Sequence, residues 1–266
     1  MTRVLISLSS YGAAEVRRHG QLWFTHLAQA AGADGVEVRG ELLVDAASEL
    51  PALAEAVRAL NIAVVYSSPE GLWAADGTLD QAALERALSA SATLGAPRLK
   101  MAIGGFGAGS RASLAQLRQA LAQAGTELLI ENDQTEPAGT LPALLAFFAA
   151  AQDRELALGM TFDMGNWHWL GECPLQAARA CAARVRYVHC KGVLREARRW
   201  VAVPLADSAA PWRAVLRALP PDVPWAIEYP LVGDDLLAVT RAQVALLRAV
   251  QARMQSHPTL PSPVPA

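Results

Sequence analysis

Short, strongly apolar segments alternate with longer Ala/Leu-rich stretches along the chain. Short apolar runs predict buried β-strands, and longer stretches with apolar residues at helical spacing predict helices. We predict strands at 4–10, 35–41, 63–69, 98–104, 127–133, 158–166, 185–193 and 224–231. We predict helices near 15–31, 48–60, 80–94, 111–124, 140–151, 174–183, 209–219 and 234–255. This alternation implies parallel strands joined by crossover helices. The expected fold is therefore a parallel, eight-stranded (β/α)₈ barrel of the α/β class, with an open doubly wound sheet as the alternative.

The predicted barrel occupies residues 1–255 as one domain, because no Pro/Ser-rich linker interrupts the chain before Ser256. The tail 256–266 contains four prolines and lacks the apolar pattern of a core element. We expect this Pro-rich tail to be disordered.

Composition and charge narrow the range of partners. Hydrophobic residues make up 53% of the chain, which allows a substantial core. The net charge of −2 and a pI of about 6.2 give no reason to expect nucleic acid as a partner. The densest basic cluster, Arg195, Arg198 and Arg199, is interpreted as a solvated loop. A small molecule is the expected partner.

Cysteine usage and the N-terminus favour a cytoplasmic protein. The three cysteines form no CxxC pair, which is typical of reduced thiols, and no signal-peptide pattern precedes the first strand. No apolar stretch approaches the ~20 residues that a membrane-spanning helix needs. We therefore expect no membrane association, and a homodimer is the default oligomeric state.

Four predicted strands end at a residue that can bind a metal. The residues are Glu131, Asp163, His189 and Glu228, and each follows a strongly apolar run. Because catalytic groups of such barrels lie at the carboxyl ends of the strands, we expect these side chains to converge. Three carboxylates and an imidazole suit one divalent ion, Mn, Mg, Co or Zn. The alternatives are carboxylates that cap the following helices and a hydrogen-bonded core histidine.

Strand alternation predicts the chemistry of this site. Glu131 and Glu228 are expected to face the barrel mouth from opposite walls. Two such carboxylates could remove a proton from a substrate and return it on another face, while the metal stabilises the enediolate that forms. Lys191 lies two residues after His189, so strand alternation points both side chains to the same face of the strand. Burial of a lysine charge costs free energy unless the ammonium contacts an anion or a polarised oxygen. The predicted catalytic residues are therefore Glu131, Glu228 and Lys191.

Other residues are candidates for binding the substrate. Arg39, Tyr66 and Lys100 fall late in their strands and could bind a carboxylate or phosphate. Arg39 could instead pair with a neighbouring glutamate of its own strand. Asn166 could bond a sugar hydroxyl, and Trp167 could form an apolar wall of the pocket.

These segments resemble the xylose-isomerase-like TIM-barrel superfamily. The ordered set Glu131, Asp163, His189 and Glu228 matches the Glu–Asp–His–Glu metal site of that superfamily, and the two glutamates match its acid/base pair. The segments 162–167 and 188–191 resemble its sugar phosphate isomerase/epimerase branch. The segments 7–12 and 130–135 are similar to the epimerase-like protein of 2-ketogluconate utilisation. The resemblance implies a metal-dependent isomerase or epimerase of a small sugar, keto-sugar acid or sugar phosphate.

Departures from the family pattern leave alternatives open. Ketose 3-epimerases commonly carry a histidine where this chain has Asn166, although Arg195 matches their arginine, which implies a substrate contact. A 3-dehydroshikimate dehydratase-like lyase would share the metal quartet and Lys191, but such lyases carry a histidine at the position of Asp133. The other alternative is a non-catalytic sugar-acid binding barrel. Endonuclease IV, another member of the superfamily, needs several more histidine ligands for its metal cluster. The five histidines of this chain cannot supply them, so a DNA-repair function is excluded.

Overall fold

Ten strands and ten α-helices make up the described part of the chain. The structure is a computed structural model that describes residues 2–256, so the predicted disordered tail beyond Ser256 lies outside the described residues. The strands are β1 Val4–Ser7, β2 Gly35–Arg39, β3 Ala63–Trp73, β4 Arg98–Gly104, β5 Glu127–Glu131, β6 Gly159–Asp163, β7 Val185–Cys190, β8 Gly192–Glu196, β9 Arg199–Val203 and β10 Trp225–Ile227. The helices are α1 Ala13–His19, α2 Gln21–Ala30, α3 Ala46–Ala59, α4 Gln81–Leu94, α5 Leu114–Ala122, α6 Glu136–Gly139, α7 Leu141–Gln152, α8 Pro174–Cys181, α9 Trp212–Arg217 and α10 Leu236–Ser256.

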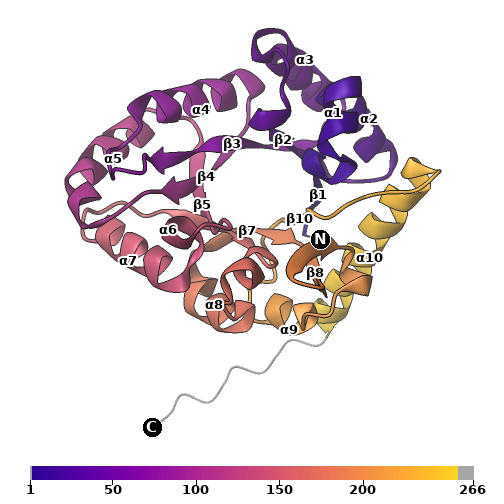
Figure 1. Cartoon of the computed structure of the whole chain (residues 1–266). Coiled ribbons are helices and arrows are strands. Elements are labelled where there is room, and N and C mark those ends of the chain that lie inside the picture. Colours follow the sequence, from indigo (N-terminus) through magenta and orange to yellow (C-terminus); the bar gives the residue numbers. More distant parts are fainter. Residues whose placement is uncertain (1, 257–266) are drawn as a thin grey trace.

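The strands close into a parallel barrel. Its order is β1-β10-β7-β6-β5-β4-β3-β2, with β1 pairing with both β10 and β2. The helices surround this ring of strands (Figure 1). The predicted (β/α)₈ barrel is therefore confirmed, and the open doubly wound sheet is excluded.

Two layers of apolar side chains hold the barrel together. A small inner cluster contains Leu5, Val65, Leu129, Tyr187 and Ala226, one from each of five strands. Inward-facing side chains that meet in this way fill the interior of such a barrel as a packed core. The larger cluster lies between the strands and the helices and includes most of the remaining buried apolar residues. The inner cluster forms the floor beneath the charged residues described below.

Most predicted strands are too long at their carboxyl ends. The segments Leu8–Tyr11, Gly40–Leu42 and Asn166–Leu170 are 3₁₀ turns, although the sequence pattern extends the preceding strands into all three. The predicted helix 15–31 is two helices, because Gly20 adopts a positive φ of 81° between α1 and α2. The turns place polar side chains at the rim of the barrel rather than along its wall.

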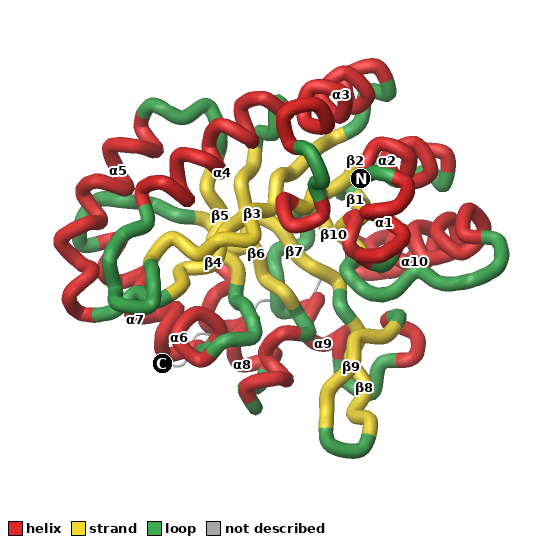
Figure 2. Tube along the Cα trace, turned by 45° about the horizontal axis from the view of Figure 1, so that its top comes forward, coloured by secondary structure: helices red, strands yellow, loops and turns green. Residues whose placement is uncertain are grey.

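An antiparallel hairpin, β8–β9, follows β7 and was not predicted. Its register pairs Gly192 with Val203 and Glu196 with Arg199. Figure 2 shows the hairpin projecting away from the barrel strands. Between residues 2 and 256, no helix has both the length and the apolar character needed to span a membrane.

Candidate metal centre

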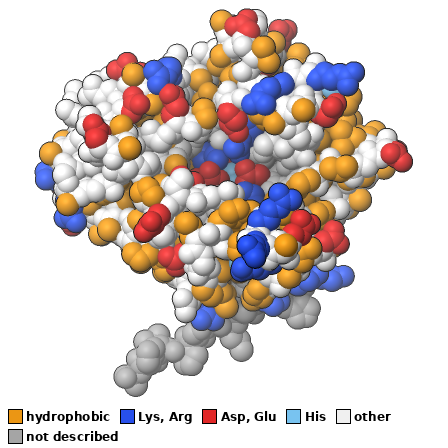
Figure 3. Space-filling view, viewed as in Figure 1, with side chains coloured by type: hydrophobic (Ala, Val, Ile, Leu, Met, Phe, Trp, Pro, Cys, Tyr) orange, Lys and Arg blue, Asp and Glu red, His pale blue; other side chains and the backbone are white. Residues whose placement is uncertain are grey.

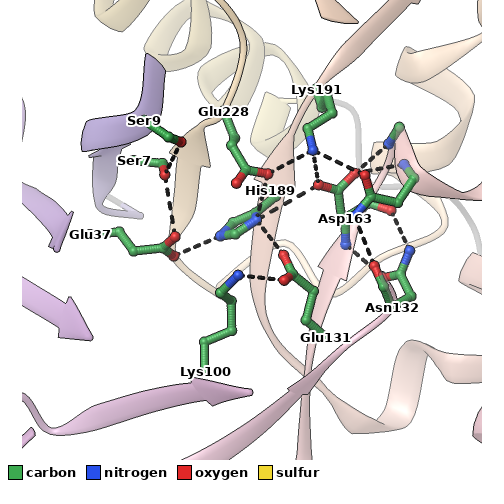
Figure 4. A network of polar contacts seen from close by, with 12 residues as sticks. Ser7, Ser9, Glu37, Lys100, Glu131, Asn132, Asp163, His189, Lys191 and Glu228 are labelled. Carbon is green, nitrogen blue, oxygen red and sulfur yellow. Dashed lines mark hydrogen bonds and ion pairs between the residues drawn. The ribbon is translucent and has the colours of Figure 1, made fainter. Parts of the chain in front are cut away.

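The four predicted ligands come together at one end of the barrel. Glu131 and Asp163 are the last residues of β5 and β6, His189 lies in β7, and Glu228 directly follows β10. Each offers one ligand atom, and these atoms all lie within 4.8 Å of one another. Figure 4 shows the four side chains converging from neighbouring strands. The convergence follows from parallel strands that all end on the same side.

The spacing of the donor atoms suits a divalent ion. His189 Nδ1 lies 2.9 Å from both Glu131 Oε1 and Glu228 Oε2, and 3.8 Å from Asp163 Oδ2. Two donors 2.9 Å apart subtend an angle of about 90° at an ion bound at about 2.1 Å, as neighbouring ligands of an octahedron do. Within residues 2–256, Asp163 Oδ2, His189 Nδ1 and Glu228 Oε2 are buried without a hydrogen bond of proper geometry. These buried polar atoms and their hard O/N chemistry fit a divalent metal.

Three cations stabilise the ionised carboxylates. Lys100 contacts Glu131 Oε2, Arg39 Nη1 lies 2.7 Å from Glu228 Oε1, and Lys191 Nζ forms ion pairs with Asp163 and Glu228. The last two distances are 2.7 Å to Asp163 Oδ2 and 2.9 Å to Glu228 Oε2. These cations contact all three carboxylates of the cluster.

The electrostatic environment differs among the carboxylates. Burial alone raises the pKa of Glu228, but the charges of His189, Lys191 and Arg39 outweigh it and hold that pKa well below its usual range. Burial opposes the ionised form of Glu131 too, and Lys100 is the main cation that lowers its pKa. Burial dominates at Asp163 and raises its pKa despite Lys191. The two glutamates are thus held as carboxylates at neutral pH.

Glu37 is a residue of this site that sequence reasoning missed. It lies in β2, is fully buried, and its Oε2 is 2.7 Å from His189 Nε2. Burial raises the pKa of Glu37, but His189 and Lys100 together bring it down to about 2. An ionised carboxylate can only accept, so Nε2 carries the proton and donates it to Glu37. Burial lowers the pKa of His189, but Glu228 and Glu37 outweigh it and raise that pKa well above its usual value, so Nδ1 is protonated as well. A metal ion bound at Nδ1 would take the place of this second proton, while Nε2 keeps its hydrogen bond to Glu37.

The structure brings Arg39, Lys100 and Lys191 to the cluster, where each forms ion pairs with carboxylates. Asn166 also lies there, and both polar atoms of its side chain form hydrogen bonds. Its Nδ2 donates to the Asn132 carbonyl at 2.9 Å, and its Oδ1 lies 3.0 Å from both Gln134 Nε2 and Lys191 Nζ. The prediction that Asn166 binds a sugar hydroxyl is therefore replaced by a role in holding Lys191.

Three other predicted substrate contacts do not lie in the cluster. Trp167 is fully buried in the large apolar cluster beside Phe162, so the prediction that it forms a wall of the pocket is wrong. Tyr66 belongs to that same outer cluster, whereas its neighbour Val65 faces the barrel interior. Strand alternation therefore turns Tyr66 away from the charged cluster. Arg195 lies on the exposed β8–β9 hairpin.

A cavity of about 290 Å³ adjoins the cluster. It is lined by Lys191 and Glu228, together with residues 9–12, Tyr229, Pro230, Val232 and Ala202 of the hairpin. Figure 3 shows acidic and basic side chains in the opening at the centre of the molecule. The volume lies at the small end of the range for ligand sites, so the cavity suits a small molecule.

Comparison with known proteins assigns the family. The family model described as xylose isomerase-like TIM barrel matches residues 25–250. The chain belongs to this family. No curated protein sequence matches it significantly.

Solved structures of similar fold include several enzymes. An L-ribulose 3-epimerase structure superposes with a TM-score of 0.71 at 18% identity, and the match covers 100% of both chains. D-allulose 3-epimerase from Methylomonas sp., in complex with D-allulose, gives 0.66 at 15% identity over 93% of this chain and 96% of that one. The probable 3-DHS dehydratase AsbF from Bacillus anthracis gives 0.67 at 14% identity, over 92% and 98% of the two chains. These matches show a shared fold.

Proposed function

We propose that the protein is a divalent-metal-dependent isomerase or epimerase of a small sugar, keto-sugar acid or sugar phosphate. The observation that carries this proposal is the convergence of Glu131, Asp163, His189 and Glu228 within 4.8 Å, beside a small cavity. Membership of the xylose isomerase-like family and the epimerases among the similar folds support it.

The four converging side chains would hold one Mn, Mg, Co or Zn ion. When bound, that ion would polarise the substrate carbonyl and stabilise the negative charge that develops on its oxygen. Glu37 would orient His189 for the ion through the 2.7 Å contact to Nε2.

The two glutamates would move the proton. Glu131 comes from β5 and Glu228 from the end of β10, and each places one carboxylate oxygen 2.9 Å from His189 Nδ1. One carboxylate would remove the proton from the carbon next to the carbonyl, and the other would return a proton to the substrate. Lys191, which lines the cavity with Glu228, would donate a hydrogen bond to a substrate oxygen.

Exchange of substrate C–H protons with solvent deuterium tests this proposal. Mn²⁺-loaded protein is incubated in D₂O with a panel of small ketoses, keto-sugar acids and sugar phosphates, and loss of the C–H signal is followed by NMR. We expect Glu131→Gln and Glu228→Gln to slow the exchange by at least ~100-fold. Glu70→Gln, whose carboxylate pairs with Arg86 on the surface, should exchange at the wild-type rate. Metal content and circular dichroism of each variant separate lost chemistry from lost metal or fold.

Two alternatives predict different results. A 3-dehydroshikimate dehydratase-like lyase would eliminate water and create a new ultraviolet absorbance, and the position of Lys191 against two carboxylates is compatible with that chemistry. Asp133, at the position where such lyases carry a histidine, accepts hydrogen bonds from the backbone and side chain of Thr135 at 2.7 Å. A non-catalytic barrel would bind sugars without exchange. Absence of exchange and of elimination across the panel would contradict the enzymatic proposal.

A further inference from the structure

The cations at the cluster are already engaged by carboxylates. Arg39, Lys100 and Lys191 each lie within ion-pair distance of at least one buried carboxylate. An anionic group of a substrate that bound one of them would compete with these pairs, and removing a partner from a buried ion pair is costly. A free cation for such a group must therefore come from the rim of the barrel.

The β8–β9 hairpin supplies positive charge at that rim. Arg195, Arg198 and Arg199 are opposed within the hairpin by Glu196 alone, which leaves an excess of positive charge. Figure 3 shows Lys and Arg side chains gathered beside the central opening. This charge would attract anionic ligands to the mouth of the barrel.

The register of the hairpin decides which arginine faces the mouth. Residues directly opposite each other in an antiparallel pair share a face, and the face alternates along each strand. Val193 lies opposite Ala202, and Ala202 lines the cavity beside the metal cluster. Arg195 lies opposite Trp200, two residues along, so this pair is on the same face. Arg199, opposite Glu196, is on the other face.

Aromatic contacts hold Arg195 and leave its N–H groups available. Its guanidinium carbon lies 5.5 Å from the centroid of the Trp200 ring. That ring also packs against His168, which follows β6, with a centroid distance of 4.9 Å. Among residues 2–256, no acidic side chain forms an ion pair with Arg195. His168 Nε2 is buried without a hydrogen-bond partner in the same part of the chain, and burial lowers the pKa of the ring.

Resting on the proposed function, we propose that the hairpin binds an anionic group at the far end of the substrate. Arg195, held against Trp200 and His168, would receive a carboxylate or a phosphate. The Arg195–Trp200 pair lies about 7 Å further along the hairpin than the cavity wall at Ala202, from the rise of a β-strand. The substrate class is therefore a small sugar acid or sugar phosphate whose reacting carbons lie at the metal cluster.

Ligands that differ only at one end test this proposal. D-fructose, D-fructuronate and D-fructose 6-phosphate share a ketohexose chain and carry a hydroxyl, a carboxylate or a phosphate at C6. Their affinities for the Mn²⁺-loaded full chain are measured by calorimetry. We expect at least one anionic ligand to bind at least ~10-fold more tightly than D-fructose, as charge-assisted hydrogen bonds allow. Comparison of the two anionic ligands identifies the carboxylate or the phosphate as the preferred group.

Arg195→Gln should abolish the advantage of the anionic ligand and leave the affinity for D-fructose unchanged. Arg199→Gln is the matched control, because it removes the same charge from the opposite face of the same hairpin. Equal affinity for the three ligands, or equal losses in the two variants, would overturn the proposal. If the three affinities were equal while deuterium exchange in D-fructose still required Glu131 and Glu228, the anion site would be overturned and the proposed function would stand. Arg195-dependent binding without any exchange would support the anion site and contradict the proposed function.

Discussion

Replacing Glu37 by glutamine should weaken metal binding, although Glu37 is not one of the four ligands. The carboxylate holds the Nε2 proton of His189 at 2.7 Å, which leaves Nδ1 for the ion. A glutamine amide can donate to Nε2, and that hydrogen bond would favour the tautomer whose proton is on Nδ1. Both side chains are fully buried, so water is not available to replace the lost carboxylate.

The size of this effect follows from the contact that is lost. Partners that orient a metal-binding histidine are typically worth about 10–100-fold in metal affinity. That range corresponds to about 1.4–2.7 kcal/mol. The short distance and complete burial of the Glu37–His189 contact favour the upper half of the range. We therefore expect the Kd for Mn²⁺ to rise by at least ~30-fold in Glu37→Gln.

Titration of free Mn²⁺ by electron paramagnetic resonance measures this affinity without a substrate. Glu41→Gln is the matched control, because Glu41 also pairs with Arg39, at 2.9 Å, but its side chain is about one third exposed and it forms no ion pair with His189 in the described chain. We expect its Kd to stay within about 3-fold of wild type. An unchanged Kd in Glu37→Gln, or the same loss in both variants, would refute the proposed orientation of His189.

Three further outcomes test the fold and the site. Leu129→Ala should lower the free energy of unfolding by about 2–5 kcal/mol, measured by urea denaturation, because Leu129 is fully buried in the inner cluster of the barrel; a loss below about 1 kcal/mol would contradict that packing. An alkylating reagent at pH 8 should modify Cys173 alone in the folded protein, as counted by mass spectrometry. Cys181 and Cys190 are buried, and burial raises the pKa of the Cys181 thiol to about 11 and raises that of Cys190 as well; rapid labelling of either would contradict their burial. Mn²⁺ at 100 times its Kd should raise the free energy of unfolding by about 2.7 kcal/mol in thermal unfolding, relative to a chelated sample. The same gain in Asp163→Asn at the same Mn²⁺ concentration would show that the ion binds away from Asp163.

The sequence predicted the barrel and the convergence of Glu131, Asp163, His189 and Glu228 for one physical reason. A parallel strand that is buried on both faces is a continuous apolar run, so a charged residue or histidine at its end stands out. Glu131, Asp163 and His189 each interrupt such a run, and parallel strands bring their carboxyl ends to the same side. Lys191 could be predicted because strand alternation gives it the same facing as His189.

Glu37 could not be assigned in this way, because its partner is distant in the sequence. Its strand also contains Arg39 and is followed by Glu41, and local pairing among these three explained the charges adequately. Only the closure of the barrel brings Glu37 against His189, 152 residues away. The sequence signal that could have identified it is its place between Val36 and Val38 in an apolar strand, where strand alternation gives it the same facing as Arg39.

The positions of Asn166, Trp167 and the hairpin depended on backbone geometry that the pattern did not show. The 3₁₀ turn Asn166–Leu170 directs Trp167 into the core and places Asn166 beside Lys191. The β8–β9 hairpin is short and carries several charged residues, and Ala197 in its turn adopts a positive φ of 47°, a conformation usually taken by glycine or asparagine. Neither feature produces the long apolar periodicity that identifies the barrel elements.

Equilibrium binding of Mn²⁺ to protein purified without chelator tests the central claim most directly. The geometry of Glu131, Asp163, His189 and Glu228 predicts about one tightly bound ion per chain, which EDTA removes and which Asp163→Asn weakens strongly. No binding by the wild-type chain, or binding that Asp163→Asn leaves unchanged, would contradict the metal centre and with it the proposed isomerase or epimerase.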